Sequence, residues 1–261
     1  MADPGWIAHA LAVACGGLVG FSLALTGGGG SILAVPLLLY VVGMRDAHLA
    51  IGTSALAVAI NAYANLIPHA RAGHVRWRAA FVFTAMGIVG AFAGSELGKW
   101  VDGRRLIGLF AVLMLVVAAL MIRPRRRLAT ADPAAAPERL DLRLSATGLG
   151  AGAIAGFFGI GGGFLIVPGL MLSARMEIIH AIGTSLFGVG SFGLTTAFNY
   201  ARSGLVDWPV AIAFILGGVA GGWIGARAAH RLAARRGALN AIFAAMIFAV
   251  GMYMLIRTHG V

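Results

Sequence analysis

Long apolar stretches separated by short polar segments occupy most of the chain. A helix needs roughly 17 to 25 predominantly apolar residues to cross a bilayer, and these stretches fall near or above that length. They form two sets, which are 6–44, 48–68, 79–97 and 106–122, followed by 144–174, 178–200, 210–226 and 238–256. The pattern predicts an all-α polytopic membrane protein.

The composition supports this prediction. Hydrophobic residues make up 60% of the chain and charged residues only 11%, whereas soluble domains carry roughly 25% charged residues. This balance excludes a soluble enzyme and a disordered chain. The single cysteine, Cys15, excludes a disulfide scaffold.

The segment 123–143 is the one truly hydrophilic stretch, and it divides the chain into two parts. We expect a transmembrane repeat over 1–122, a cytoplasmic linker over 123–143 and a second repeat over 144–261. The net charge of +11 comes from arginines clustered between apolar stretches, as in cytoplasmic loops, so nucleic-acid binding is not expected. Because the first basic residue is Arg45, we expect the first apolar segment to be retained rather than cleaved as a signal peptide.

The two parts repeat each other in sequence. The glycine-rich block 27–36 matches 159–168, and Ala-Ile-Gly-Thr-Ser at 50–54 recurs at 181–185. Further along, Gly87, Gly90 and Gly94 correspond to Gly218, Gly221 and Gly225. For these spaced glycines we favour close helix packing over a binding role. Duplication of this kind is typical of secondary transporters.

The orientation of the repeats depends on the glycine-interrupted first stretch of each half. A single broken span would give parallel repeats, whereas a helical hairpin, spanning or re-entrant, would give inverted ones. With the linker in the cytoplasm, the hairpin arrangement places most arginines inside, and the broken span divides them almost evenly. We therefore favour inverted repeats, each a glycine-tipped hairpin plus three transmembrane helices, giving about eight to ten membrane segments.

The glycine runs are the leading candidate site. At membrane depth, irregular backbone is tolerated only inside protein or beside a watery cavity, and a glycine turn exposes N–H donors at a helix start. We predict that these donors and nearby hydroxyls bind an anion. The alternatives are helix packing for the glycines and a bond to the i−4 carbonyl for the hydroxyls. The candidates are Gly27, Gly28, Gly29, Gly30, Ser31, Thr53, Ser54, Gly161, Gly162, Gly163, Thr184 and Ser185.

Other polar residues in or beside apolar stretches are weaker candidates. For Asn61, Asn65 and Asn199, substrate contact and bonding between helices are equally supported. We include Asn65 and Asn199 in the substrate site. Arg71 and Arg202 are gate or approach candidates, with membrane anchoring as the alternative. All nine acidic residues lie in loops or near segment ends, which disfavours a cation substrate. We expect no metal and no cofactor.

The duplicated glycine–proline block, the Ala-Ile-Gly-Thr-Ser block and the spaced glycines resemble the TauE/SafE (sulfite exporter, TSUP) family of membrane permeases. The residues that carry the resemblance are Gly27–Ser31, Pro36, Gly52–Ser54, Gly161–Gly163, Pro168 and Gly183–Ser185, while Ile160 departs from it opposite Gly28. The resemblance implies transport of sulfite or small organosulfonates such as sulfoacetate.

These observations together predict a secondary transporter that exports a small anion, such as sulfite or sulfoacetate, across the bacterial inner membrane by alternating access. The expected partners are this anion and the lipid bilayer, and a homodimer is left open. The alternatives are a non-transporting membrane partner protein and an intramembrane serine hydrolase. A hydrolase would need a histidine or lysine base beside its serine, and only His48 and His180 are near in sequence, so we do not expect an enzyme.

Overall fold

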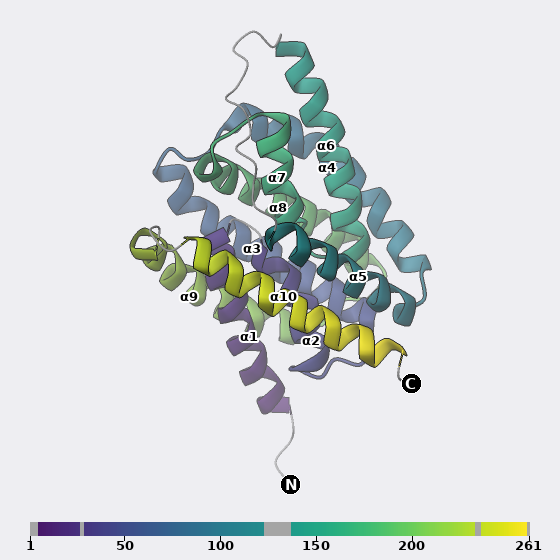
Figure 1. The fold of residues 1–261 in the computed structure, drawn as a ribbon. Coiled ribbons are helices and arrows are strands. Elements are labelled where there is room, and N and C mark those ends of the chain that lie inside the picture. Colours follow the sequence, from purple (N-terminus) through teal and green to yellow (C-terminus); the bar gives the residue numbers. More distant parts are fainter. Residues whose placement is uncertain (1–4, 27–28, 123–136, 233–235, 260–261) are drawn as a thin grey trace.

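The structure, a computed structural model, describes residues 5–26, 29–122, 137–232 and 236–259, and every element within these ranges is helical (Figure 1). The first half contains α1 (Gly5–Thr26), η1 (Gly29–Leu33), α2 (Ala34–Tyr40), α3 (Ala47–Arg71), α4 (Trp77–Trp100) and α5 (Gly103–Ile122). The second half contains α6 (Pro137–Phe158), α7 (Gly163–Ser173), α8 (Ile178–Arg202), α9 (Trp208–Leu232) and α10 (Arg236–His259). The predicted all-α fold is confirmed.

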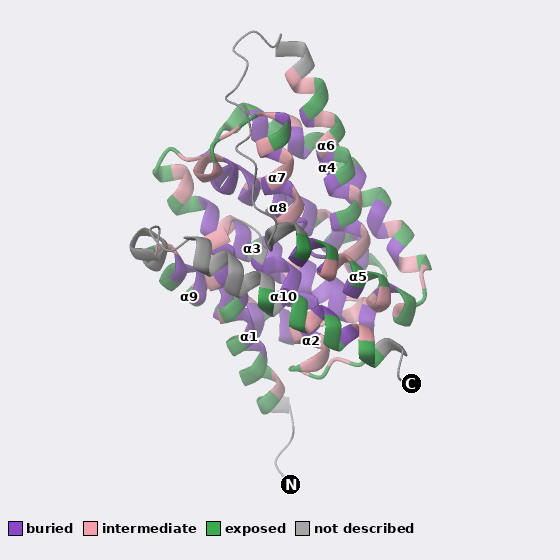
Figure 2. Ribbon diagram, in the orientation of Figure 1, coloured by how far each residue is buried: buried purple, intermediate pink, exposed green. Residues whose placement is uncertain are grey.

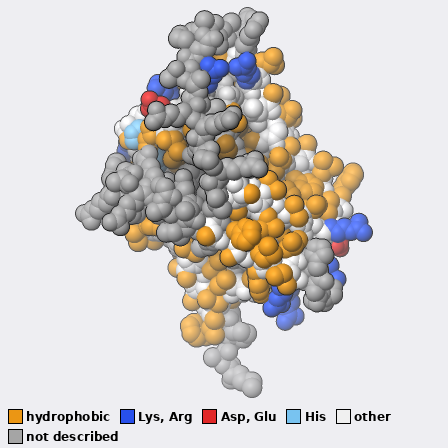
Figure 3. Space-filling view, viewed as in Figure 1, with side chains coloured by type: hydrophobic (Ala, Val, Ile, Leu, Met, Phe, Trp, Pro, Cys, Tyr) orange, Lys and Arg blue, Asp and Glu red, His pale blue; other side chains and the backbone are white. Residues whose placement is uncertain are grey.

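Five of the described helices, α1, α3, α4, α8 and α9, are long and apolar enough to cross a membrane. Their outward faces carry large apolar side chains, including Phe81, Leu216 and Trp223, each more than half exposed. Figure 3 shows apolar side chains spread over the described part of one face. A soluble monomer rarely exposes so much contiguous apolar area, so this surface faces lipid.

The second arm of each glycine-tipped hairpin is short. Helix α2 has 7 residues and α7 has 11, so α7 rises about 17 Å, whereas the apolar layer of a bilayer is about 30 Å thick. Each hairpin therefore combines a long helix, α1 or α6, with an arm that cannot cross the bilayer alone.

The two halves are interleaved through their long hairpin helices. Helix α1 of the first half packs on α9 of the second, and α6 of the second half packs on α4 of the first. Small residues make these contacts close: Gly90 and Gly94 face the carbonyls of Leu149 and Ala153 on α6, and Gly221 faces the backbone of Gly17 on α1. The packing interpretation of the spaced glycines is confirmed.

Helices α3 and α8 form the centre of the protein and run antiparallel to each other. Gly52, near the start of α3, lies beside Tyr200 near the end of α8. Farther along α3, Tyr63 bonds Ser191 at 2.8 Å between their hydroxyl oxygens. Both helices are mostly buried (Figure 2), and α5 and α10 pack against each other outside them (Figure 1).

Helix α6 begins earlier than the apolar pattern predicts. Its first residue is Pro137, inside the segment that we expected to be a linker. Proline is favoured at the first position of a helix because its fixed φ suits the helix and its missing N–H costs no bond there. The polar first turns of α6 therefore extend the helix beyond its apolar stretch, and residues 123–136 of the linker lie outside the described residues.

Candidate functional site

A tight glycine turn joins α6 to α7 inside the protein. Gly159, Gly161 and Gly162 all adopt left-handed backbone conformations, with φ of 66°, 63° and 70°, which residues with a Cβ adopt only at a cost. Ile160, between them, is fully buried. The turn therefore requires glycine at three positions, and Gly159 joins the predicted Gly161 and Gly162.

The first glycine run lies against this second hairpin. Gly27 and Gly28 lie outside the described residues. Gly29 begins η1, in which Gly30 and Ser31 are buried, and η1 contacts α7. The segments that carry the two glycine runs, one from each half, therefore meet in the interior, as a shared site requires.

Ser54 connects the first half to the glycine turn of the second. Its buried hydroxyl lies 2.9 Å from the carbonyl oxygen of Ile51 and 3.3 Å from that of Gly159, so one hydroxyl hydrogen is shared between two acceptors. The corresponding Ser185 hydroxyl donates to the Ile182 carbonyl at 2.8 Å. Both serines thus bond backbone carbonyls, and Ser54 positions the turn directly.

The two threonines of the repeated block hold the starts of helices in the opposite half. The Thr53 hydroxyl donates to the Leu49 carbonyl at 2.6 Å and accepts from the backbone N–H of Asp207 at 2.9 Å. The Thr184 hydroxyl accepts from the backbone N–H of Arg76 at 3.0 Å. Asp207 and Arg76 directly precede α9 and α4, so the two bonds are reciprocal. In this conformation both threonine oxygens bond backbone groups.

Asn199 belongs to a polar cluster between α4 and α8. Its amide donates to the Ser95 hydroxyl at 2.7 Å, and its oxygen accepts from Lys99 at 2.8 Å. The same ammonium donates to Glu96 and to Ser203, at 3.2 and 3.3 Å. Of the two roles considered for Asn199, this geometry shows bonding between helices. The signal that sequence analysis passed over was Lys99 itself, the one lysine in the chain.

Asn61 and Asn65 lie one turn apart on α3 and face α9. The Asn65 amide donates to the Asn61 carbonyl at 2.9 Å and lies beside Gly222. The Asn61 side chain is fully buried beside Gly218, and neither its amide nitrogen nor its oxygen has a partner among the described residues. A buried amide without partners costs free energy, so the Asn61 side chain lowers the stability of the packing between α3 and α9.

The two halves differ at this position. In the second half Phe192 packs on Gly87, and these residues correspond in the repeat to Asn61 and Gly218. An apolar ring therefore fits the equivalent helix contact in the second half. At this position the unpartnered amide is a feature of the first half alone. A comparison of the two halves in the sequence could therefore have singled out Asn61, rather than Asn65, as a candidate site residue.

Arg71 and Arg202 lie at the ends of α3 and α8, and both are exposed. Because these helices are antiparallel, the two arginines lie toward opposite ends of the protein. Arg202 places its guanidinium 5.9 Å from the ring centre of Phe198. Neither arginine reaches the glycine turn, and both positions suit an outer approach or an anchor.

A lipid-facing helical bundle with two interleaved halves and paired glycine segments defines a polytopic membrane protein. The family model described as "Sulfite exporter TauE/SafE" matches residues 12–254. The chain belongs to this family.

Relatives are named as transporters in distant organisms. A "Probable membrane transporter protein" of Xylella fastidiosa is 52% identical over 94% of both chains. YdhB of Bacillus subtilis is 27% identical over 80% of this chain and 86% of its own, and MJ0441 of Methanocaldococcus jannaschii is 24% identical over 94% and 95%. Each is named as a probable membrane transporter protein. No solved structure matches the chain significantly.

Proposed function

We propose that the protein exports a small sulfur oxyanion or organosulfonate, such as sulfite or sulfoacetate, across the bacterial inner membrane, with the linker in the cytoplasm. The observation that carries the proposal is the meeting of the two glycine segments, where α7 starts on a turn of three left-handed glycines. The anion would bind at this turn, and alternating access would come from rocking of the halves or from movement of the glycine-tipped hairpins.

The start of α7 suits an anion. Gly162 caps this helix without any side-chain hydrogen bond, so the first N–H groups of the helix are not satisfied by a capping side chain. Such donors, together with the positive end of the helix dipole, favour a negative ligand. In this conformation Gly159, Gly161 and Gly162 pack closely against neighbouring side chains, so the oxygens of a sulfonate or sulfite would reach these donors when the turn moves.

Inverted repeats would supply the movement. The equivalent helices α3 and α8 run antiparallel, and the equivalent threonines Thr53 and Thr184 make reciprocal bonds to the opposite half. Two inverted halves around a shared midplane site can exchange conformations, and this exchange opens the site to either side in turn. These observations support inverted over parallel repeats.

The direct test is anion flux through the purified full-length protein in proteoliposomes. We expect efflux of sulfite or sulfoacetate above that of empty vesicles, with chloride as the comparison anion. The same anion should stabilise the protein in detergent, because a ligand at 100 times its Kd adds about 2.7 kcal/mol. If no sulfur anion gives either flux or stabilisation, the proposal is contradicted.

Replacing Asn61 by leucine should stabilise the protein and reduce transport at the same time. Leucine removes a buried amide that lacks partners, so we expect the free energy of unfolding to rise by about 1 kcal/mol. If the amide contacts the anion during transport, flux should fall by about tenfold. Melting temperature and proteoliposome flux are both measured.

Asn65→Leu is the matched control, one turn away on the same face. It loses the bond between its amide and the Asn61 carbonyl, so it should lower the melting temperature rather than raise it. Unchanged flux in Asn61→Leu would show that the amide takes no part in transport.

A further inference from the structure

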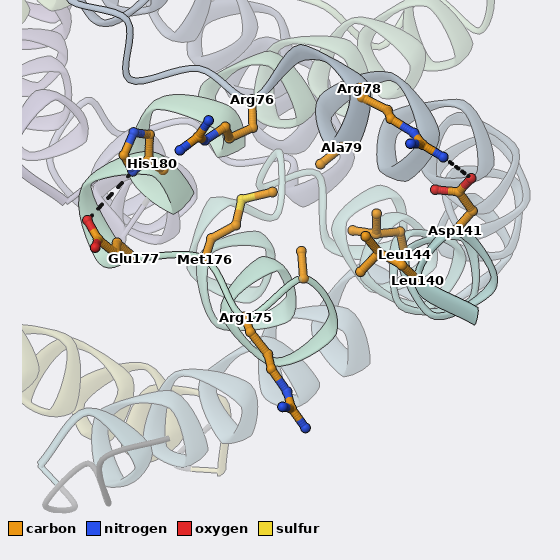
Figure 4. A pocket seen from close by; sticks show the side chains of 11 residues that line it. Arg76, Arg78, Ala79, Leu140, Asp141, Leu144, Arg175, Met176, Glu177 and His180 are labelled. Carbon is orange, nitrogen blue, oxygen red and sulfur yellow. Dashed lines mark hydrogen bonds and ion pairs between the residues drawn. The ribbon is translucent and has the colours of Figure 1, made fainter. Parts of the chain in front are cut away.

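A cavity of about 410 Å³ opens at the end of the protein where α4, α6 and α8 begin, outside the glycine site. Arg76, Arg78, Arg175 and His180 line it, together with the carboxylates Asp141 and Glu177 (Figure 4). Its remaining lining is apolar, including Leu140, Leu144 and Met176. The cavity therefore combines a cationic rim with an apolar wall.

The arginines of this rim are not equally engaged. Arg78 forms an exposed ion pair with Asp141 at 3.0 Å, and Glu177 lies 3.8 Å from His180. Figure 4 shows the Arg76 guanidinium directed toward His180, on the side away from Arg78, while Arg175 points away from both. Among the described residues no carboxylate pairs with Arg76, so its guanidinium is available to a ligand.

The repeat shows that the fold does not require these arginines. Arg76 and Arg78 correspond to Asp207 and Pro209 in the other half. Arg175 stands where the first half has Gly43, and both adopt a left-handed backbone, with φ of 49° and 86°. Arginine at such a position costs free energy that glycine does not. These three positions thus carry arginine in one half only.

We propose that this cavity is a second anion site, in which Arg76 binds an oxyanion and the apolar wall holds an attached carbon group. A guanidinium matches the oxygens of a sulfonate, carboxylate or phosphate with two parallel hydrogen bonds. Such an anion can come from the cytosol, as substrate waiting to enter, or from a lipid headgroup. The first source rests on the proposed function, because it assigns the cavity to the side from which export starts.

Arg76 also links the cavity to the central helices. Its backbone N–H donates to the Thr184 hydroxyl, and Thr184 precedes Ser185 on α8. An anion on the Arg76 side chain therefore acts on a residue that is already bonded to the helix beside the glycine site. This connection makes the cavity a vestibule rather than an isolated surface hollow.

The test is Arg76→Gln in the full-length protein, which keeps the backbone bond to Thr184 and removes the charge. In lipid-free detergent, sulfoacetate binding is titrated; in a separate arm, retention of phosphatidylglycerol is measured by native mass spectrometry. We expect at least one of the two to weaken by about tenfold, with Arg76→Lys intermediate. Loss in the sulfoacetate arm identifies a soluble anion as the ligand, and loss in the lipid arm identifies a headgroup.

Arg105→Gln is the matched control, because Arg105 is exposed at the start of α5, away from the cavity. It should change neither measurement. If Arg76→Gln binds both probes like the wild type, the inference is overturned. If binding depends on Arg76 but no anion is transported, the proposed function fails and the anion site stands.

Discussion

Gly152→Leu should prevent the two halves from assembling, whereas Gly150→Leu should leave the protein folded. Both residues lie on α6, but their surroundings differ. A Cβ at Gly152 would lie 2.7 Å from the carbonyl carbon of Gly87 on α4, and a Cβ at Gly150 would meet nothing within 4 Å. Backbone cannot yield as a side-chain tip can, so the α4–α6 contact must open.

We expect Gly152→Leu to destabilise the protein by more than about 3 kcal/mol, the upper range for overpacking a well-packed interface. Gly150→Leu adds an apolar side chain on an exposed position and improves helix propensity, so its melting temperature should match or exceed that of the wild type. Fluorescence-detected size exclusion and thermal unfolding in detergent measure both variants. A folded, wild-type-like Gly152→Leu would contradict the packing described between α4 and α6.

The segments that cross the membrane could be predicted from hydropathy, and so could the role of the spaced glycines. Hydropathy could not predict the partners of these helices. Ser54 bonds Gly159 and Thr53 bonds Asp207 across the two halves, and nothing in the local pattern around either residue identifies a partner so distant in sequence. Such contacts follow from the interleaving of the halves, which is a property of the whole fold.

At the candidate site, too, some features could be predicted from the sequence and others could not. The glycine runs could be located because glycine is unfavourable inside an apolar helix, and three residues of the second turn do adopt the left-handed conformation. The apolar stretch of α6 could not predict its polar start at Pro137. The unpartnered state of Asn61 depends on the packing of α9 against α3, and the engagement of Asn199 depends on Lys99 from another helix.

The interleaving also constrains how the protein can move. Because α1 lies on α9 and α6 lies on α4, each half carries a long helix of the other, and a simple separation of the halves would expose both glycine-lined contacts. The short arms α2 and α7 pack against the opposite half less extensively. Motion of these arms about their glycine turns therefore disturbs less packed surface than motion of a whole half, and a change at the turn should affect transport before stability.

Gly161→Ala should reduce transport by about tenfold or more while the protein remains folded. The added methyl group would lie 3.0 Å from a methyl of Val189 and 3.2 Å from one of Val58, inside the turn that leads into α7. Alanine also tolerates φ of 63° poorly, at a cost of about 1 to 2 kcal/mol. Relieving both shifts the turn and the N–H groups at the start of α7, and displacements of about 1 Å at a site can cost 100-fold.

Gly204→Ala separates the backbone cost from the effect on the site. Gly204 also adopts a left-handed conformation, with φ of 71°, but a Cβ there would meet nothing within 4 Å. Both variants should therefore lose stability through the backbone, Gly161→Ala more because of its added contacts, and only Gly161→Ala should lose flux in proteoliposomes loaded with sulfite or sulfoacetate. The backbone penalty is common to both variants, whereas only Gly161→Ala adds contacts with Val58 and Val189. Equal flux in the two variants would therefore mean that the turn shapes the fold without lying on the transport path.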